Sequence, residues 1–405
     1  MMARFSWVYY PNLLILISEF FADEAIAVKD SSYNTQSLVE MFHSYFGWNR
    51  ARIHCIVALI LGIIQLGTVN LTKIACAFPG KALSDSSYKR LQRLFRYFNL
   101  DFDKMSQFIA HLTGLDQWKL TLDRTNWKFG IYNVNYLTLG IAHIKIAFPL
   151  FWTCLKKQGN SNTQERMDLL DRLINVFGLS RIACLLADRE FIGKDWFKYL
   201  IDKNILFRIR IKSNTQVANS RGGLVPVRNL FRHLRRESYC ILSGKRQLWG
   251  HQLYLIGFKM SDGKLVMIAT QEKPETALED YKDRWQIETL FSCLKTRGFD
   301  LETTHLKHPE RLEKLLAFTA IAFSWAHLVG EWRHEVKPIK IKKHDRPARS
   351  LFRYGLDYLK SCLSHLQESR RQQAFHQAIE LLFKPLGWSP QYLHFSKNLS
   401  LNSVC

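Results

Sequence analysis

Residues 181–191 read Arg-Ile-Ala-Cys-Leu-Leu-Ala-Asp-Arg-Glu-Phe, and this stretch decides how the fold is interpreted. From residue 181 to 187 the run is almost continuously apolar, which is typical of a strand buried on both faces of a sheet. The run ends at Asp188. Open α/β sheets bind ligands at the carboxyl ends of their strands, so Asp188 lies where functional residues gather. For a single aspartate in this position, the alternative is a turn residue or the cap of the next helix.

The segments on either side of this strand predict a mixed sheet. Before it come three β-rich runs joined by short turns, which we expect to pair antiparallel, and then an amphipathic helix that ends at Gly178; these segments are residues 119–123, 134–142, 145–153 and 162–177. After it come a helix over residues 194–203 and a strand over residues 205–212. The order β-β-β-α-β-α-β predicts an α/β fold, in which a mixed sheet is flanked by helices.

The rest of the chain divides into regions of different composition. We expect an N-terminal extension over residues 1–35, a helical region over 36–114, the sheet domain over 115–335, and a basic linker with a helical C-terminal region over 336–405. Within the sheet domain, residues 213–272 are rich in Gly, Ser and β-branched residues and are predicted to be a β-rich insertion. Its strands are expected at 239–242, 247–258 and 264–270, and a long apolar helix is expected at 309–332.

The charge of the chain is strongly positive. Its 405 residues include 57 Lys and Arg against 35 Asp and Glu, a net charge of +22, while 47% are hydrophobic, as in a folded protein. Such an excess suggests nucleic acid or an anionic membrane as partner. No apolar run is expected to be long enough to span a membrane, because the best candidate, residues 55–66, is too short. The eight cysteines show no metal-ligand spacing, so we expect a reducing, cytoplasmic compartment.

A helix predicted over residues 84–98 has a basic face. Lys89, Arg93 and Arg96 fall on one side and apolar residues on the other, and the Ser/Asp cluster at 84–87 is expected to supply the N-cap. This helix either docks on DNA or presents an ordinary solvated face, and its sequence favours neither. The middle of the insertion, residues 228–246, is also rich in arginine and lysine.

Residues 281–295 read Tyr-Lys-Asp-Arg-Trp-Gln-Ile-Glu-Thr-Leu-Phe-Ser-Cys-Leu-Lys, which predicts a second informative helix. Successive residues of a helix are rotated by about 100°, so Tyr281, Arg284, Glu288 and Lys295 share one stripe. The apolar residues of the segment gather on another side and should face the core. Taken alone, the stripe favours a solvated face with an Arg284–Glu288 pair four residues apart.

Three acids stand out by position. Asp123 ends the first alternating strand, Asp188 ends the buried strand, and Glu288 lies on a helix that should pack against the sheet. Carboxylates are the ligands that Mg²⁺ and Mn²⁺ prefer. Converging carboxylates repel one another, which raises their pKa values unless cations neutralise them. Two metal ions roughly 4 Å apart can activate an attacking oxygen and stabilise a leaving one in phosphodiester chemistry. Together the three acids favour that function.

The spacing Tyr281-x2-Arg284-x3-Glu288-x6-Lys295 resembles the Tyr-Arg-Glu-Lys signature of the insertion-sequence-four family of cut-and-paste DNA transposases. Residues 123–127 resemble the segment around that family's first catalytic aspartate, and residues 186–191 resemble the second. The family also places a β-rich insertion between the second aspartate and the glutamate. The resemblance covers roughly residues 85–335, with a weaker likeness in the helical N-terminal region.

The resemblance implies a ribonuclease-H-like catalytic domain with a DDE triad. Asp123, Asp188 and Glu288 would bind two Mg²⁺ ions, for which Mn²⁺ may substitute. Tyr281, Arg284 and Lys295 would contact the phosphate backbone at the transposon end. Relatives cut DNA through a hairpin on that end and join the free 3′-hydroxyl to target DNA.

The implied partner is double-stranded DNA, as terminal inverted repeats and as target, bound by a homodimer in a synaptic complex near the bacterial nucleoid and without a membrane. Further DNA contacts are expected from Lys89, Arg93 and Arg96, and from Arg210 and Lys212 on the strand at 205–212. Relatives stack a strand Trp on a flipped base, but residues 265–270 contain no aromatic. Trp249 or Tyr254 would have to substitute, although packing in the insertion core is the favoured role for both.

Two other functions stay open. A catalytically silent protein would bind the DNA ends and regulate transposition, and the intact triad argues against it. A general ribonuclease-H-like nuclease is disfavoured by the insertion and the basic termini.

Overall fold

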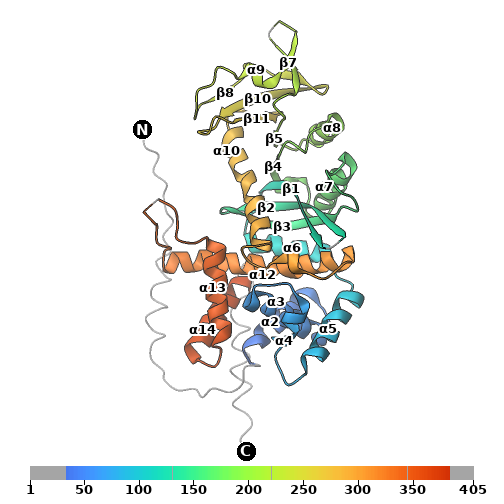
Figure 1. Ribbon diagram of the computed structural model, residues 1–405, viewed down its shortest axis with the longest axis vertical. Helices are drawn as coiled ribbons and strands as arrows, with labels where there is room; N and C mark the ends of the chain where they lie inside the picture. Colours follow the sequence, from blue (N-terminus) through green and yellow to red (C-terminus); the bar gives the residue numbers. More distant parts are fainter. Residues whose placement is uncertain (1–32, 130, 220, 344, 384–405) are drawn as a thin grey trace, which may run out of the picture.

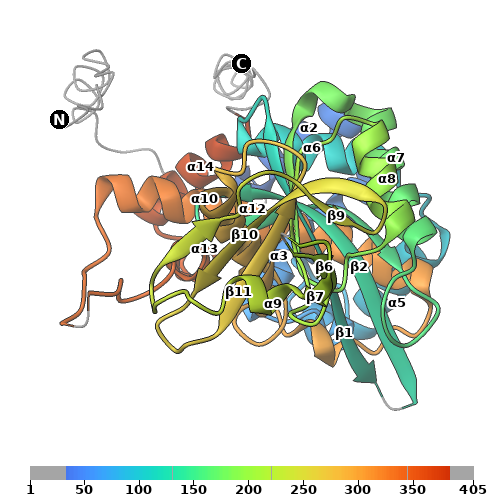
Figure 2. The same ribbon diagram turned by 90° about the horizontal axis from the view of Figure 1, so that it is seen from above.

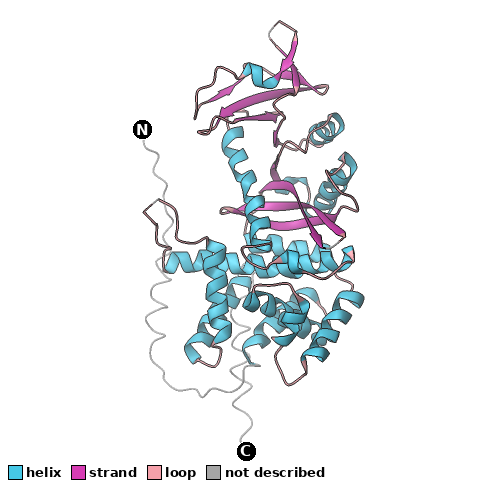
Figure 3. Cartoon of the chain, in the orientation of Figure 1, coloured by secondary structure: helices cyan, strands magenta, loops and turns pink. Residues whose placement is uncertain are grey.

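The structure is a computed structural model of the chain, and it describes residues 33–129, 131–219, 221–343 and 345–383. Nearly all of the expected N-terminal extension, residues 1–35, lies outside the described residues, and so does the end of the C-terminal region, residues 384–405. The described parts stack in layers. A sheet fills the upper half of Figure 1, helix α12 (Pro309–Val336) runs across beneath it, and the helices of residues 33–97 lie below α12. Figure 3 shows the same separation, with strands above and helices below.

The sheet has nine strands in the order β3-β2-β1-β4-β5-β11-β10-β8, with β9 paired to β10, and a separate ribbon joins β6 to β7. Strand β1 pairs antiparallel with β2 and parallel with β4, and β4 pairs parallel with β5. The order β3-β2-β1-β4-β5 with β2 reversed is that of a ribonuclease-H-like fold, so the predicted mixed sheet is confirmed. The strands are β1 (Trp118–Phe129), β2 (Tyr132–His143), β3 (Ile146–Cys154), β4 (Ile182–Ala187), β5 (Phe207–Arg210), β6 (Gln216–Ala218), β7 (Leu224–Pro226), β8 (Tyr239–Ile241), β9 (Arg246–Leu248), β10 (His251–Lys259) and β11 (Leu265–Thr270).

Strands of the predicted insertion continue the central sheet. β11 pairs antiparallel with β5, in the register Ile268↔Arg210, and thereby covers an edge that would otherwise be exposed. The expectation of one strand over residues 247–258 was wrong, because β9 and β10 form a hairpin there. Its turn is made by Trp249 and Gly250, both with positive φ. A tryptophan in this backbone conformation is uncommon, so the pattern of side chains did not reveal the turn.

Helices cover both faces of the sheet. The side chains of β2 alternate: Leu137, Leu139 and Ile141 pack in a core with α7 and α8, while Tyr136 packs in a second core with α11 and α12. The helices are α2 (Tyr33–Phe46), α3 (Arg50–Leu66), α4 (Leu71–Cys76), α5 (Ser84–Tyr97), α6 (Phe102–Thr113), α7 (Thr163–Phe177), α8 (Lys194–Asp202), α9 (Val227–Leu230), α10 (Ala277–Lys282), α11 (Gln286–Leu294), α12 (Pro309–Val336), α13 (Leu351–Ser364) and α14 (Ser369–Phe383), with short 3₁₀ turns at Leu179–Arg181 (η3), Asp283–Trp285 (η4) and Leu301–Thr303 (η5).

Two sequence-based expectations about helix ends had different outcomes. Helix α7 begins after Asn162, whose side chain forms a capping box with Glu165, as the predicted start at residue 162 required. The expected Ser/Asp cap of α5 was wrong. The cap residue is Leu83, which makes no side-chain cap bond, and Asp85 lies in the first turn instead. There the carboxylate favours the helix through the dipole rather than through a cap.

Helix α12 corrects the expectation that no apolar run could span a membrane. By length and composition it could cross one, but 83% of its most apolar window is buried inside the protein. A helix that is apolar on all sides is typical of a protein core. α13 crosses α12 at very close range: a Cβ on Gly330 would lie 1.9 Å from the Leu351 carbonyl oxygen, and one on Gly355 would lie 1.8 Å from that of Ala326. Only glycine at both positions allows this crossing.

Candidate active site

Strand pairing brings the two aspartates together. β1 and β4 are parallel neighbours in the register Leu122↔Ala187, so the residues that follow, Asp123 and Asp188, lie side by side. β1 continues to Phe129, beyond the expected end at residue 123, and Asp123 therefore lies within the strand rather than after it. Asp188 comes directly after β4, at the carboxyl end of the buried strand.

Glu288 reaches the aspartates from a helical segment with a break in it. The helix predicted over residues 281–295 consists of α10, the 3₁₀ turn η4 and α11. Arg284 in that turn is only 4% exposed and lies between two acids. Its Nη2 donates to Glu288 Oε1 at 2.6 Å, and its Nη1 lies 3.6 Å from Asp123 Oδ2. The structure therefore joins the glutamate to the first aspartate through one guanidinium.

Two cations hold this helical segment on the sheet. Lys119 of β1 lies 3.0 Å from Asp280 and 2.9 Å from Asp283. Arg208 of β5 is fully buried and lies 3.1 Å from Asp280; it also donates to Thr270 and Thr276. Sequence reasoning missed these residues as positioning groups. The available signal was the parity of Lys119, which places it on the same face of β1 as Thr121 and Asp123.

Asp188 has partners of its own. The Tyr281 hydroxyl donates to Asp188 Oδ1 at 3.4 Å, and Arg210 Nη1 lies 3.5 Å from the same oxygen. Burial raises the pKa of Tyr281, so its hydroxyl keeps the proton that it donates. Tyr281, Arg284 and Glu288 therefore face the two aspartates, as the predicted stripe required.

Asp123 is the acid with the least favourable surroundings for a charge. Burial raises its pKa to about 7, and the nearby carboxylates of Glu190 and Glu288 add to the rise. The backbone amide of Arg124, which donates at 2.7 Å, and the guanidinium of Arg284 oppose it without cancelling it. Carboxylates whose neighbouring cations do not neutralise them fully are a suitable donor set for a hard divalent cation. The residues present therefore fit the metal that the resemblance implies.

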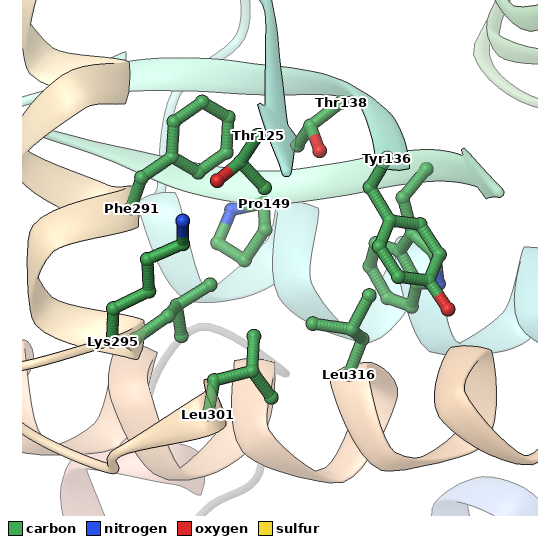
Figure 4. A pocket seen from close by; sticks show the side chains of 10 residues that line it. Thr125, Tyr136, Thr138, Pro149, Phe291, Lys295, Leu301 and Leu316 are labelled. Carbon is green, nitrogen blue, oxygen red and sulfur yellow. The ribbon is translucent and has the colours of Figure 1, made fainter. Parts of the chain in front are cut away.

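Lys295 lies apart from this group. Lys295 is the C-cap of α11, seven residues after Glu288, so at 1.5 Å per residue it lies about 10 Å further along the helix axis. The Lys295 Nζ donates to the Asn126 carbonyl oxygen at 2.9 Å and lies 3.0 Å from Glu302. Figure 4 shows its side chain in a small pocket with Phe291, between α11 and the sheet.

A basic groove of about 420 Å³ begins beside Asp188. It lies between β5, β11 and the segment around α9, which Figure 2 shows next to β11. Six cationic residues line it, and none of its described lining residues is acidic; the cations are Arg189, Arg210, Arg228, Arg232, Lys259 and Lys264. The sequence indicated Arg210 and the basic middle of the insertion. It missed Arg189, Lys259 and Lys264, which reach the groove only through strand pairing. Lys212 is exposed just beyond β5.

The remaining predicted DNA contacts lie elsewhere. Lys89, Arg93 and Arg96 are exposed on α5, which lies on the far side of α12 from β1 and β4 (Figure 1). Trp249 packs against Phe197, with ring centroids 5.2 Å apart, in agreement with the core alternative. Sequence reasoning missed Trp285, which is 63% exposed beside Arg284. The signal was an aromatic residue inside the charged stripe segment.

Comparison with known proteins supports the class that the fold and the acids define. Residues 150–325 match the family model of the transposase DDE domain, a range that contains Asp188 and Glu288. This match supports a DNA transposase of the DDE class, a class that generally uses divalent metal ions. No curated protein matches the chain.

One similar solved structure is a piggyBac transposase synaptic complex with hairpin DNA. The sequence identity is 11% and the TM-score is 0.42, and the similarity covers 88% of this chain and 77% of that chain. This TM-score is too low for the likeness to carry an argument. The fold is identified from the strand topology, and the class of protein is supported by the family match and the three acids.

Proposed function

We propose that the chain is a cut-and-paste transposase of the insertion-sequence-four family, which excises and integrates its own insertion sequence. The observation that carries the proposal is the meeting of Asp123, Asp188 and Glu288 at one edge of a ribonuclease-H-like sheet. Asp123 is held there with a pKa of about 7, because burial and neighbouring acids disfavour its charge. Acids left without enough positive charge suit the binding of cations rather than structural pairing.

Asp123, Asp188 and Glu288 would hold two Mg²⁺ ions, or Mn²⁺ in their place. When bound, the ions would activate a water or a 3′-hydroxyl and stabilise the leaving oxygen. Arg284 would meet the phosphate beside them. Its buried Nε has no hydrogen-bond partner among the described residues, so the guanidinium keeps a donor for a phosphate oxygen. Tyr281 would hold Asp188 in place through its hydroxyl.

The basic groove would bind a DNA strand next to the acids. Arg210 belongs to both sites, because it lies 3.5 Å from Asp188 and lines the groove. A strand that follows the groove would therefore pass the second aspartate. Phosphates neutralised by lysine and arginine release counterions, so end binding should weaken steeply with salt.

Trp285 is our candidate for stacking on an unpaired base during a hairpin step. It is exposed beside Arg284, whereas Trp249 packs in the core. Base stacking does not depend on which aromatic supplies the ring and contributes about 1–3 kcal/mol per base. Trp285→Ala should therefore slow hairpin formation about tenfold or more and leave the first nick intact, while Trp249→Phe should change neither step. Equal hairpin rates for wild type and Trp285→Ala would exclude this role.

Joining both ends of an element requires that they be held together, so we propose a homodimer in a synaptic complex that acts at the bacterial nucleoid. The direct test uses the purified chain and DNA that carries the terminal inverted repeats flanking its own gene. With Mg²⁺ we expect nicks at the repeats and joining of the freed 3′-hydroxyl to target DNA. Asp188→Asn should abolish both, and Asp202→Asn, in an exposed pair with Lys198, is the matched control.

Other outcomes would identify another function. Tight binding of the repeats without any nick in Mg²⁺ or Mn²⁺ would indicate a silent regulator of transposition. The observation that favours this alternative is the buried Arg284, which already pairs with two of the acids. Degradation of DNA without terminal repeats would indicate a general nuclease.

A further inference from the structure

A second group of metal-ligating side chains lies outside the acidic site. His143 is the last residue of β2, while His327 and Glu331 lie one turn apart on α12. His143 Nε2 lies 2.9 Å from Glu331 Oε1, and His327 Nε2 lies 2.8 Å from the same oxygen. One potential ligand atom from each residue lies within 4.8 Å of the other two. Two elements far apart in the sequence thus bring two imidazoles to one carboxylate.

His327 is deeply buried for a polar side chain. It is 1% exposed, and neither of its ring nitrogens has a hydrogen-bond partner of good geometry among the described residues. Its Nε2 nevertheless lies 2.8 Å from Glu331 Oε1, so the carboxylate is a close charged neighbour of the ring. Buried polar atoms in native structures nearly always have a partner. Coordination of a cation would use His327 Nε2, the ring nitrogen that faces Glu331.

The walls of the group are aromatic. The ring of Phe148 on β3 lies 4.9 Å from the ring of His143 and 5.8 Å from that of His327, between centroids. Phe323, one turn before His327 on α12, packs against Phe148 in turn. An apolar wall excludes water and strengthens the binding of a cation to its ligands.

We infer that His143, His327 and Glu331 bind one divalent ion of the zinc type. Imidazole nitrogens suit Zn²⁺, Ni²⁺ and Cu²⁺, whereas Mg²⁺ and Ca²⁺ prefer oxygen ligands. Two histidines and a glutamate form a known zinc ligand set, with a fourth position left for water. Ligand atoms around a tetrahedral zinc ion lie about 3.3 Å apart, given metal–ligand distances near 2.0–2.1 Å. The present nitrogen–oxygen distances of 2.8 and 2.9 Å must therefore open by only about 0.5 Å, within reach of a side-chain rotation.

This site is distinct from the three acids. Thr138 of β2 pairs with Asp123, and His143 lies five residues further along the same strand. At about 3.4 Å per residue, the two sites are roughly 17 Å apart. The histidine site joins the β2–β3 hairpin to α12, and so links the sheet to the helical layer beneath it. Its role is to stabilise that junction.

Cobalt binding tests the inference directly. The full chain, stripped with EDTA and kept in excess Mg²⁺ to occupy the acids, is titrated with Co²⁺ as a spectroscopic substitute for Zn²⁺. We expect the visible band of a low-coordinate cobalt site that saturates near one ion per chain and disappears when Zn²⁺ is added. His143→Ala and Glu331→Gln should each weaken binding at least about tenfold. Glu288→Gln in the acidic site and His54→Ala, exposed on α3, should bind as wild type does.

A second measurement protects the test against variants that fail to fold. X-ray absorption of the zinc-loaded wild type should show scattering from two imidazoles. The inference is wrong if no band forms, if the band survives both ligand substitutions, or if zinc in the wild type lacks imidazole ligands. These readouts require no DNA cleavage, so they stand apart from the proposed transposase activity.

Discussion

The segment α10–η4–α11 carries acids in two different electrostatic environments. In its first half, Asp280 and Asp283 face Lys119 and Arg208. Burial alone would raise the pKa of Asp280, but Lys119 and Arg208 outweigh it and lower that pKa. In its second half, Glu288 faces Asp123, whose pKa rises to about 7.

This difference in surroundings distinguishes the acids that hold the helical segment on the sheet from the acids that are available to bind a metal ion. Asp280 and Asp283 are neutralised by cations of the sheet and fix the helix on it, whereas Asp123 and Glu288 share the single guanidinium of Arg284 and keep negative charge for a divalent ion. The balance of charge around each carboxylate separates these two pairs of acids.

The largest expected effect is on Glu288, which shares the guanidinium of Arg284 with Asp123. Glu288→Gln keeps the shape of the side chain but removes a charged ligand, so DNA cleavage in Mg²⁺ should fall by about 10³-fold or more, or about 4 kcal/mol of activation free energy. Glu279→Gln, on the exposed face of α10, is the matched control and should cleave normally. Cleavage of end-labelled repeats gives both rates. If both variants cleave equally, Glu288 is not a metal ligand.

The second-largest expected effect is a loss of stability in α10, where Lys119 and Arg208 neutralise Asp280. Arg208→Met leaves Asp280 with one of its two cations, so the free energy of unfolding in urea should fall by about 3 kcal/mol. Lys198→Met removes one partner of an exposed pair with Asp202 and should change it by less than about 0.5 kcal/mol. Similar losses for the two variants would mean that the buried network does not hold the helix.

Much of the fold followed from local patterns. The order of strands and helices from residue 119 to 212 reflects side-chain periodicity, which a single sequence displays. The sequence also indicated Asp188 at the end of a buried strand and Glu288 on a helix, as the structure has them, whereas Asp123 lies within β1 rather than at its end. Their interpretation as metal ligands depends on all three acids occurring together.

The features that the sequence did not reveal depend on distant partners or on backbone conformation. In the sequence Arg208 is an ordinary strand residue, because its partners Asp280 and Thr276 come close to it only in the folded chain. Lys295 binds the Asn126 carbonyl oxygen and Glu302, which lie far from it in the sequence or carry no signal of the contact. His143 and His327 have no ligand spacing in the chain, since the β2–β3 hairpin and α12 meet only in three dimensions.

A pH-dependent effect sharpens the comparison at Asp123. Below about pH 4 this carboxyl is protonated in both folded and unfolded chains. Between about pH 4 and pH 7 the unfolded chain releases the proton while the folded chain keeps it, so wild type loses stability as the pH rises. Asp123→Asn avoids this loss, so without metal its stability relative to wild type should rise by about 4 kcal/mol between pH 4 and pH 8.

Thermal or urea unfolding at pH 5, 6, 7 and 8 checks this expectation at Asp123. The gap between variant and wild type should widen up to about pH 7 and stay constant above it. Mg²⁺ should narrow or reverse the gap, because it binds the charged wild-type site and stabilises it by mass action. A gap that is independent of pH would contradict a raised pKa at Asp123.

The smallest effect separates the two basic surfaces. Each phosphate contact that is lost should reduce the slope of log affinity against log salt by about 1 and weaken binding modestly. If the strand follows the groove beside Asp188, Arg232→Ala should reduce that slope for DNA carrying the repeats, and Arg93→Ala on α5 should do so only if α5 also docks on the same DNA. Titrations by fluorescence anisotropy at several salt concentrations measure both. If the slope is unchanged for Arg232→Ala and reduced for Arg93→Ala, the DNA binds the helical layer rather than the groove beside Asp188. The three acids would then need a second protomer to bring a DNA strand to them.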